Sequence, residues 1–242
     1  MNYPVFFISD IHLDKREPGR IEGFLKFLHF SQEQNASVYI LGDLFNFWVG
    51  NAQAQWKMYQ PLLKKMKAMS KEKKLFFLPG NRDFLFAPYW TKLKCAVLEE
   101  KDVLEFPPHR ILLSHGDILC TKDAAYQKIR SLLRSKTIYH LSRFLPGFLC
   151  LRMGQNLRKA SKASIQKKDH SYLSPDLGFA HFLLREKNCN IMLCGHFHSH
   201  KILPLASHTK LYILPECKGN VFSFLAWDKQ EFQECSFQAC SP

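Results

Sequence analysis

Five short apolar runs along this chain each lead into an Asp, Asn or His. Each run holds four or five residues, many of them β-branched or aromatic, which is typical of a buried strand in an α/β sheet. The runs are Val5–Ser9, Val38–Leu41, Leu75–Pro79, Ile111–Ser114 and Ile191–Cys194. The polar residues that follow them are Asp10 and His12, Asp43, Asn81, His115, and His196 and His198. Because open α/β sheets place their sites at the carboxyl ends of strands, we expect these side chains to share one site.

Helical spacing appears between the apolar runs. Residues 20–34 carry apolar side chains on one stripe, which predicts a helix with one buried face. A second helix is predicted over about 53–70. The pair Ser174-Pro175 reads as an N-cap and first helical position, and it predicts a helix that runs to about Lys187.

Further β-runs occupy the rest of the chain. Short strands are predicted over Ala96–Glu99 and Val103–Phe106. After residue 201, three more runs alternate with turns, and we expect them to close a second sheet. They are Leu211–Leu214, Val221–Trp227 and Phe232–Phe237.

The length of the chain fits one large α/β domain as well as two small ones, and because no linker is evident we expect a single globular domain over residues 1–242. No apolar run approaches the roughly 20 residues that cross a bilayer, and the N-terminal residues have no basic stretch typical of a signal peptide. The eight cysteines are scattered without any Cys-x-x-Cys pair, which favours a reduced, cytoplasmic protein.

The net charge of +13 belongs mainly to one segment. Between Ala124 and Lys168 there are eleven Lys or Arg residues and no acid, whereas the other 23 basic residues face 21 acidic ones. Residues 122–172 look helical, and Pro146-Gly147 divides them into two pieces. Aliphatic and aromatic residues are interleaved with the basic ones throughout. We therefore expect an insertion within the domain and not a separate domain.

The polar strand ends offer a set of oxygen and nitrogen donors. Asp10 and His12, and likewise His196 and His198, are spaced by two, which in extended backbone directs both side chains to one face. Donors without thiolate suit Mn²⁺, Fe²⁺ or Zn²⁺. Seven donors are too many for one catalytic ion and fit two ions that share a bridging carboxylate. Two such ions clamp the attacking and departing oxygens of a phosphoryl displacement.

The motifs Asp-x-His, Gly-Asp, Gly-Asn-x-Asp, His-Gly-Asp and Gly-His-x-His occur in this order, and the chain thereby resembles the calcineurin-like metallophosphoesterases. Within that superfamily it resembles more closely the bacterial UDP-2,3-diacylglucosamine pyrophosphate hydrolases of lipid A biosynthesis. The matching segments are 41–50, 80–85, and 115–123 followed by Tyr126-Gln127. The resemblance implies an α/β fold of four layers, in which two mixed β-sheets are flanked by helices. It also implies that residues 122–172 form a helical lid insertion.

The resemblance implies two divalent metal ions, with Mn²⁺ favoured, and a role for each site residue. The first ion would be held by Asp10, His12, Asp43 and His198. The second would be held by Asp43, Asn81, His115 and His196, with Asp43 bridging the two. Catalytic roles would fall on Asn81, Arg82 and His115. Substrate contacts would come from Asn81, Arg82, Asp123, Ser161, Ile165, Lys168 and His196.

Several positions depart from the family's motifs, and others are expected to have no direct part in the site. Ile165 stands where the family commonly has Asn, and Asn46 where relatives carry an acidic residue. We expect Asp83 and Asp117 to orient an Asn or His ligand, as partners of metal-bound side chains usually do. Asp14 is expected to be a loop residue, and residues 216–219 carry no functional assignment.

The basic insertion has three interpretations. It could be a solvated helical pair, but ordinary surfaces mix acidic and basic residues. It could neutralise the phosphates of a nucleic acid, as in calcineurin-like nucleases. It could be a lid that lines an acyl-chain cleft and meets a diphosphate or anionic lipid headgroups. The dense aliphatic content favours the lid.

The donor set leads to the hypothesis of a two-metal phosphoester or pyrophosphate hydrolase, and the resemblance implies that it cleaves the pyrophosphate of UDP-2,3-diacylglucosamine. Water attack on the α-phosphorus would give UMP and 2,3-diacylglucosamine 1-phosphate. The alternatives are a nuclease or cyclic-nucleotide phosphodiesterase on the same site, and a non-catalytic scaffold on the same fold. We expect a monomer that binds no nucleic acid. We also expect peripheral attachment, through the insertion, to the cytoplasmic face of the inner membrane of a Gram-negative bacterium.

Overall fold

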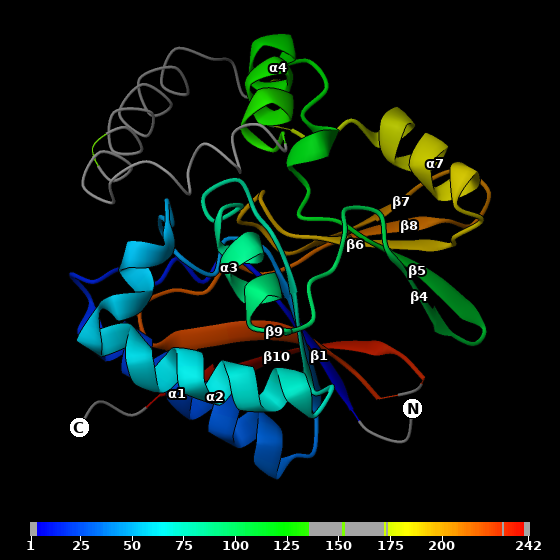
Figure 1. Ribbon diagram of the computed structural model, residues 1–242. Coiled ribbons are helices and arrows are strands. Elements are labelled where there is room, and N and C mark those ends of the chain that lie inside the picture. The colour runs from blue at the N-terminus through cyan, green and yellow to red at the C-terminus, as the bar shows by residue number, and fades with distance from the viewer. Residues whose placement is uncertain (1–3, 136–151, 153–171, 173, 229, 240–242) are drawn as a thin grey trace.

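The computed structural model describes residues 4–135, 152, 172, 174–228 and 230–239 (Figure 1). In these residues the strands form two five-stranded sheets. The first has the order β10-β9-β1-β2-β3, with strands Phe232–Gln238, Val221–Trp227, Val5–Ile8, Ser37–Leu41 and Leu75–Leu78. The second has the order β4-β5-β6-β8-β7, with strands Val103–Phe106, His109–Leu113, Ile191–Cys194, Lys210–Ile213 and Lys201–Pro204. Both sheets combine parallel and antiparallel neighbours, so the prediction of two mixed sheets is confirmed.

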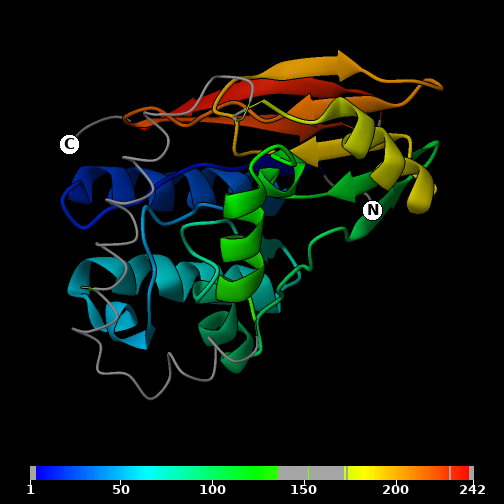
Figure 2. The same cartoon turned by 90° about the horizontal axis from the view of Figure 1, so that it is seen from above.

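Helices cover the outer faces of the two sheets (Figures 1 and 2). The described helices are α1 (Pro18–Glu33), α2 (Gln60–Lys71), α3 (Phe86–Lys92), α4 (Ala124–Leu133) and α7 (Leu177–Glu186). Short 3₁₀ turns occur at Asn51–Gln55, Lys57–Tyr59 and Asp117–Leu119. Because α1 and α2 pack on the first sheet and α7 packs on the second, the layers run helix, sheet, sheet, helix.

Alternating side chains on the strands build three apolar layers. On β1, Phe6 and Ile8 pack with the residues of α1 and α2, whereas Val5 and Phe7 point to the space between the sheets. There they belong to the same cluster as Ile111 of β5. A third cluster joins the other face of the second sheet to α7. The period of two along each strand thus explains why both sheets are covered on both faces.

Two strand predictions were wrong. Strands β9 and β10 do not close the second sheet: β9 pairs antiparallel with β1, and β10 pairs with β9, so both extend the first sheet. The expected strand at Ala96–Glu99 is reduced to one bridge between Phe77 and Val97. Pairing of this kind joins segments far apart in the chain, and a local pattern does not specify it.

Helix boundaries also differ from the predictions. The helix expected from Ser174-Pro175 begins at Leu177, and its N-cap is Asp176, whose side chain accepts a hydrogen bond from the Phe179 amide. The helix expected over 53–70 starts as two 3₁₀ turns and becomes α-helical at Gln60. Helix α4 forms the beginning of the predicted insertion. Most of the remaining insertion lies outside the described residues, so its boundaries at 122–172 stay a prediction.

Candidate metal centre

The seven predicted donors come together at the carboxyl ends of the strands. Asp10 and His12 follow β1, Asp43 follows β2, and Asn81 follows β3. From the second sheet, His115 follows β5, and His196 and His198 follow β6. Strands from both sheets therefore supply one cluster.

One group of donors surrounds Asp10. The ligand atoms of Asp10, His12 and His198 all lie within 4.8 Å of one another. Asp10 Oδ1 is 3.8 Å from Nε2 of His12 and 3.8 Å from Nε2 of His198, and the two imidazole rings stack with centroids 5.1 Å apart. The other oxygen, Asp10 Oδ2, accepts hydrogen bonds from Ser9 Oγ and from the His196 amide, each with a length of 2.8 Å. These bonds fix the carboxylate and leave Oδ1 facing the two histidines.

A second group surrounds Asp43. Asp10, Asp43 and His115 also have ligand atoms within 4.8 Å of one another. Asp43 Oδ1 is 3.6 Å from His115 Nε2, and Asp43 Oδ2 is 3.9 Å from His12 Nδ1. Asn81 Oδ1 lies 2.9 Å from His115 Nε2 and 3.1 Å from His196 Nδ1. Asp10 therefore belongs to both groups, and Asp43 has one oxygen towards His115 and the other towards His12.

The backbone of this cluster is unusual. Asp10, His12, Asp43, His196 and His198 all have positive φ, from 51° to 73°. Residues other than glycine adopt this left-handed region rarely, and such strain is concentrated at functional sites. The expectation that the spaced pairs lie in extended backbone was therefore wrong, although the side chains do converge. Tight turns after the strands bring them together.

Burial controls the protonation of the donors. Burial and the neighbouring Arg82 lower the pKa of His12, and burial together with His115 lowers the pKa of His196 to about 4. Both imidazoles are therefore neutral at pH 7 and can act as ligands. Burial and the adjacent Asp43 raise the pKa of Asp10. Burial alone would lower the pKa of His115, but Asp43 and Asp10 outweigh it and raise that pKa.

The donor set fits metal ions. Asp10 Oδ1 and both ring nitrogens of His12 are buried and have no hydrogen-bond partner within the described residues. A buried polar atom without a partner is costly, and a cation between Asp10, Asp43 and the histidines would satisfy these atoms. Carboxylate, amide and imidazole donors without thiolate match borderline divalent ions.

Arg82 is the basic residue beside this cluster. Its backbone amide donates to Asp43 Oδ1 over 2.9 Å, and its Nε lies 3.2 Å from Asp43 Oδ2. Its side chain is 33% exposed, so part of it is open to solvent.

Asp83 and Asp117 take other roles than the expected one. Asp83 accepts hydrogen bonds from the amides of Gly80 and Phe45, and so fixes the loop instead of the Asn81 side chain. Asp117 accepts hydrogen bonds from Tyr126 and Arg130 of α4 and from Arg134, the C-cap of that helix. The other ring nitrogen of His115 lies instead 2.9 Å from the Leu41 carbonyl oxygen.

The remaining predicted substrate residues are placed only in part. Asp123 is the N-cap of α4 and accepts a hydrogen bond from the Tyr126 amide over 3.1 Å. Ser161, Ile165 and Lys168 lie outside the described residues. Their contacts with substrate stay predictions.

The sequence interpretation missed two carboxylates near the cluster. Glu216 Oε1 lies 2.9 Å from Nδ1 of His198, on the side of the ring away from Asp10. Asp14 accepts hydrogen bonds from Arg16 and from Asn46. Neither residue stands in a motif, and both meet their partners through the fold, so no local signal pointed to them.

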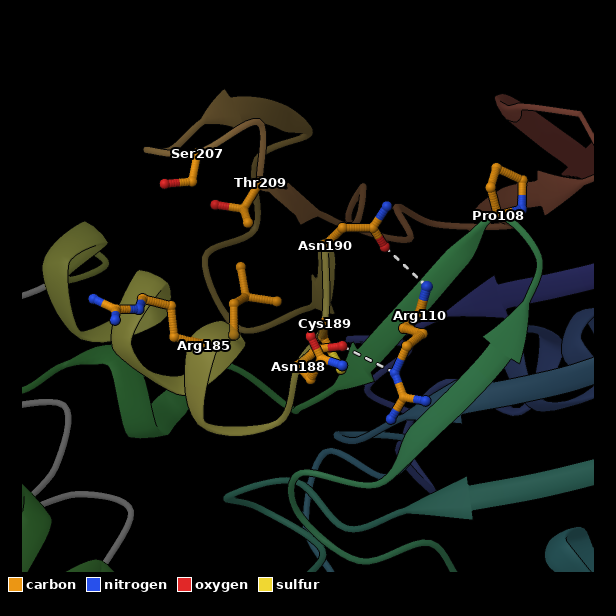
Figure 3. A pocket seen from close by; sticks show the side chains of 9 residues that line it. Pro108, Arg110, Arg185, Asn188, Cys189, Asn190, Ser207 and Thr209 are labelled. Atoms are coloured by element: carbon orange, nitrogen blue, oxygen red, sulfur yellow. Dashed lines mark hydrogen bonds between the residues drawn. The ribbon is translucent and has the colours of Figure 1, made fainter.

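A pocket lies at the opposite edge of the second sheet, at the starts of β5, β6 and β8 (Figure 3). Arg110 in its wall is already engaged: Nε donates to the Asn188 carbonyl, and Nη1 pairs with Glu105. None of the seven donors lines this pocket. Among the described residues, the seven donors instead gather at the carboxyl ends of the strands.

The layered sheets and the donor cluster place the chain in the metallophosphoesterase class. A profile of the family described as calcineurin-like phosphoesterase matches residues 3–200, and the chain belongs to this family. Curated relatives cover most of the chain and are named UDP-2,3-diacylglucosamine hydrolase. The protein from Proteus mirabilis (strain HI4320) is 34% identical over 194 residues, which cover 79% of this chain and 80% of that protein. The protein from Haemophilus influenzae (strain PittGG) is 30% identical over 226 residues, covering 93% and 94%.

Solved structures show more distant likenesses. A dimetal phosphatase from Danio rerio is 12% identical and has a TM-score of 0.49, with 99% of both chains covered. Vps29 from Chaetomium thermophilum is 10% identical and has a TM-score of 0.46, with 98% of this chain and all of that chain covered. Among the described helices, none has the length and apolar character needed to cross a membrane.

Proposed function

We propose that this protein hydrolyses the pyrophosphate bond of UDP-2,3-diacylglucosamine to UMP and 2,3-diacylglucosamine 1-phosphate, a step of lipid A biosynthesis. The observation that carries the proposal is the pair of linked donor groups: Asp10 belongs to both groups, and Asp43 directs one oxygen towards His115 and the other towards His12. Two ions that share a carboxylate suit an in-line displacement at phosphorus. The relatives from three bacterial species that carry the name UDP-2,3-diacylglucosamine hydrolase support this choice of substrate.

The residues that would hold two Mn²⁺ ions are those that the resemblance to the metallophosphoesterases implies. Asp10, His12, Asp43 and His198 would bind the first ion, and Asp43, Asn81, His115 and His196 the second. When bound, such ions lower the pKa of a water molecule and neutralise charge on the phosphoryl oxygens. Donors of oxygen and nitrogen without thiolate support Mn²⁺.

The other residues would bind and orient the substrate. Arg82 beside Asp43 would hold the diphosphate with two parallel N–H groups and stabilise the charge that develops on its oxygens. Asn81 and His115 would support the same charge from the second group. Asp123, Ser161, Ile165, Lys168 and His196 would contact the remainder of the substrate.

The insertion would bring the protein to its lipid. Its basic and aliphatic residues support contact with anionic headgroups at the cytoplasmic face of the inner membrane. The protein would act as a monomer and would bind no nucleic acid. Deletion of residues 136–158 should lower the fraction of protein recovered with the membranes of a lysate. Equal recovery before and after the deletion would count against membrane contact through this segment.

A product assay tests the proposed function. The purified protein with added Mn²⁺ is offered UDP-2,3-diacylglucosamine and a single-stranded DNA oligomer side by side, and UMP release and DNA cleavage are both followed. UMP from the lipid substrate alone is the expected result. DNA cleavage alone would make the protein a nuclease and would contradict the proposal.

A further inference from the structure

The guanidinium of Arg82 is held from two sides. On one side, Nε lies 3.2 Å from Asp43 Oδ2. On the other side, Nη1 donates a hydrogen bond to Asn46 Oδ1 over 3.1 Å. The bond to Asn46 crosses between the loops that follow β2 and β3, so it fixes one loop against the other.

Asn46 is itself fixed by a carboxylate. Its Nδ2 donates to Asp14 Oδ2 over 2.6 Å, and its backbone amide donates to the Leu13 carbonyl over 2.9 Å. The residue is 9% exposed, so water has little access to compete for these bonds. Asp14 lies on the loop after β1, and the chain of contacts therefore spans the ends of three strands.

The order of these contacts permits one orientation of the Asn46 amide. If the amide turned over, its oxygen would face the Asp14 carboxylate and its NH₂ group would face the Arg82 guanidinium. Both contacts would then be repulsive, whereas both are attractive as they stand. The carboxylate at one end and the guanidinium at the other thus lock the amide, and the amide in turn presents its oxygen to Arg82.

We propose that Asp14 and Asn46 are positioning residues that act through Arg82. Asp14 orients the Asn46 amide, and the amide oxygen holds the Arg82 guanidinium beside Asp43, where it meets the phosphate of the substrate. The phosphate contact rests on the proposed function, whereas the relay from Asp14 to Arg82 does not.

The choice of an amide has a consequence for charge. A carboxylate at position 46 would neutralise Arg82 and would stand against Asp14. The amide holds Arg82 through a neutral oxygen, so the relay adds no second acid to the one that Asp43 already provides. An arginine with more of its charge available binds an anionic diphosphate more strongly.

Arg16 provides a matched control, because it is a second partner of the Asp14 carboxylate. Its Nε donates to Asp14 Oδ1 over 2.9 Å, and Nη2 donates to Oδ2 over 2.7 Å, but its side chain is 73% exposed. Removal of Arg16 leaves the Asp14 carboxylate and its bond to Asn46 in place. The R16A variant should therefore keep kcat/KM within about twofold of wild type, since exposed ion pairs contribute little.

The test is a double-mutant cycle on UMP release by the Mn²⁺-loaded protein. R82A should lower kcat/KM about 100-fold, N46A about 10-fold, and the double variant N46A/R82A no more than R82A alone, within about twofold. D14N keeps the volume of the side chain and removes its charge, so it should lower kcat/KM about 3-fold or more even if N46A folds poorly. The proposal would be overturned if N46A lowered kcat/KM by the same factor in wild type and in R82A. It would also be overturned if both N46A and D14N kept the kcat/KM of wild type.

A second readout needs neither substrate nor metal. The Nε–Hε resonance of Arg82, assigned by its absence in R82A, should be resolved and slow to exchange in wild type and R16A. It should broaden or exchange faster in N46A and D14N. An unchanged resonance in both variants would contradict the relay. If the wild-type protein released no UMP, the proposed function would fail, and this measurement would still decide whether the relay exists.

Discussion

Arg134 Nη2 donates to Asp117 Oδ2 over 3.0 Å, and this bond ties α4 to the turn that follows His115. Arg130 joins the same network: its Nε donates to Asp117 Oδ2 over 2.8 Å, and its Nη2 donates to Glu100 Oε2 over 2.6 Å. Arg134 Nη1 also donates to Glu100 Oε2, over 2.8 Å. Glu100 in turn accepts a hydrogen bond from Ser114 Oγ, beside His115. The first helix of the insertion is thereby fixed to the metal centre by two acids and two arginines.

Loss of the Asp117 charge should destabilise the fold. Asp117 is fully buried, so D117N leaves Arg130 and Arg134 with one acid fewer in a poorly hydrated place. We expect the free energy of unfolding in urea to fall by about 3 kcal/mol, as when one partner of a buried ion pair is removed. The control is E105Q, which breaks the exposed pair of Glu105 with Arg110 and should cost less than about 1 kcal/mol. Equal losses in the two variants would show that the Asp117 network is no stronger than a surface pair.

The difference in the free energy of unfolding between wild type and D117N should depend on pH. Burial alone would raise the pKa of Asp117, but Arg134, His115 and Arg130 outweigh it and hold the pKa below its ordinary value of 3.8. A carboxyl with a lowered pKa stabilises the fold fully above its unfolded pKa, and this contribution is lost as pH falls through the folded pKa. In metal-free protein, the difference between wild type and D117N should be constant from about pH 7 to about pH 5 and shrink below about pH 4. Urea unfolding at several pH values measures it, and a difference that grew on acidification would contradict the assigned sign.

Glu216 should strengthen metal binding through His198. Its Oε1 lies 2.9 Å from His198 Nδ1, whereas Nε2 of the same ring lies 3.8 Å from Asp10 Oδ1. Carboxylates that pair with a metal-binding histidine in this way commonly contribute 10- to 100-fold in affinity. E216Q should therefore weaken Mn²⁺ binding to the metal-free protein about 10-fold, measured by calorimetry.

The matched control for this variant is E234Q. Glu234 Oε2 lies 2.7 Å from His200 Nδ1, a pair of the same kind whose histidine is outside the seven donors. Mn²⁺ affinity should be unchanged in E234Q. If both variants lost affinity equally, the effect would be one of general charge, and Glu216 would have no special role.

The parts of the site that the sequence predicts are those that local pattern specifies. An apolar run followed by Gly-Asp or Gly-His indicates a strand and the turn after it, so the position of Asp43 and His196 at strand ends could be predicted. The reason for their convergence could not, because left-handed backbone after a strand leaves no distinct signal in the residues. The spacing of Asp10 and His12 correctly predicted that their side chains lie in one cluster, but the extended backbone on which that prediction was based is wrong.

Partners that meet through the fold escaped the sequence interpretation. Asp14 and Asn46 lie 32 positions apart and touch only because the loops after β1 and β2 are neighbours. Asp117 was expected to orient a ligand and binds α4 instead, since two arginines of that helix reach it. The return of β9 to the first sheet likewise depends on pairing with β1, from the other end of the chain.

Gly195 keeps room for the Asp10 carboxylate. A Cβ at this position would overlap Ser9 Oγ and Asp10 Oδ2. G195A should therefore displace Asp10, weaken Mn²⁺ binding and lower the free energy of unfolding by about 1–3 kcal/mol. Gly19 is the control, because a Cβ there meets nothing within 4 Å, and G19A should keep the metal affinity of wild type. Calorimetry and urea unfolding test both, and normal metal binding by G195A would show that the Asp10 position tolerates a shift.

Asp43 is the carboxylate that the two proposed ions would share. Its two oxygens face His115 and His12, at 3.6 and 3.9 Å, so its removal takes a ligand from both proposed ions. D43A should abolish UMP release and lower the bound Mn²⁺ from two ions per chain, as measured by elemental analysis after gel filtration. H198A should differ, because His198 belongs to the Asp10 group alone, and one ion should remain bound. Wild-type activity in D43A, or identical metal content in D43A and wild type, would refute the shared carboxylate and with it the two-ion site.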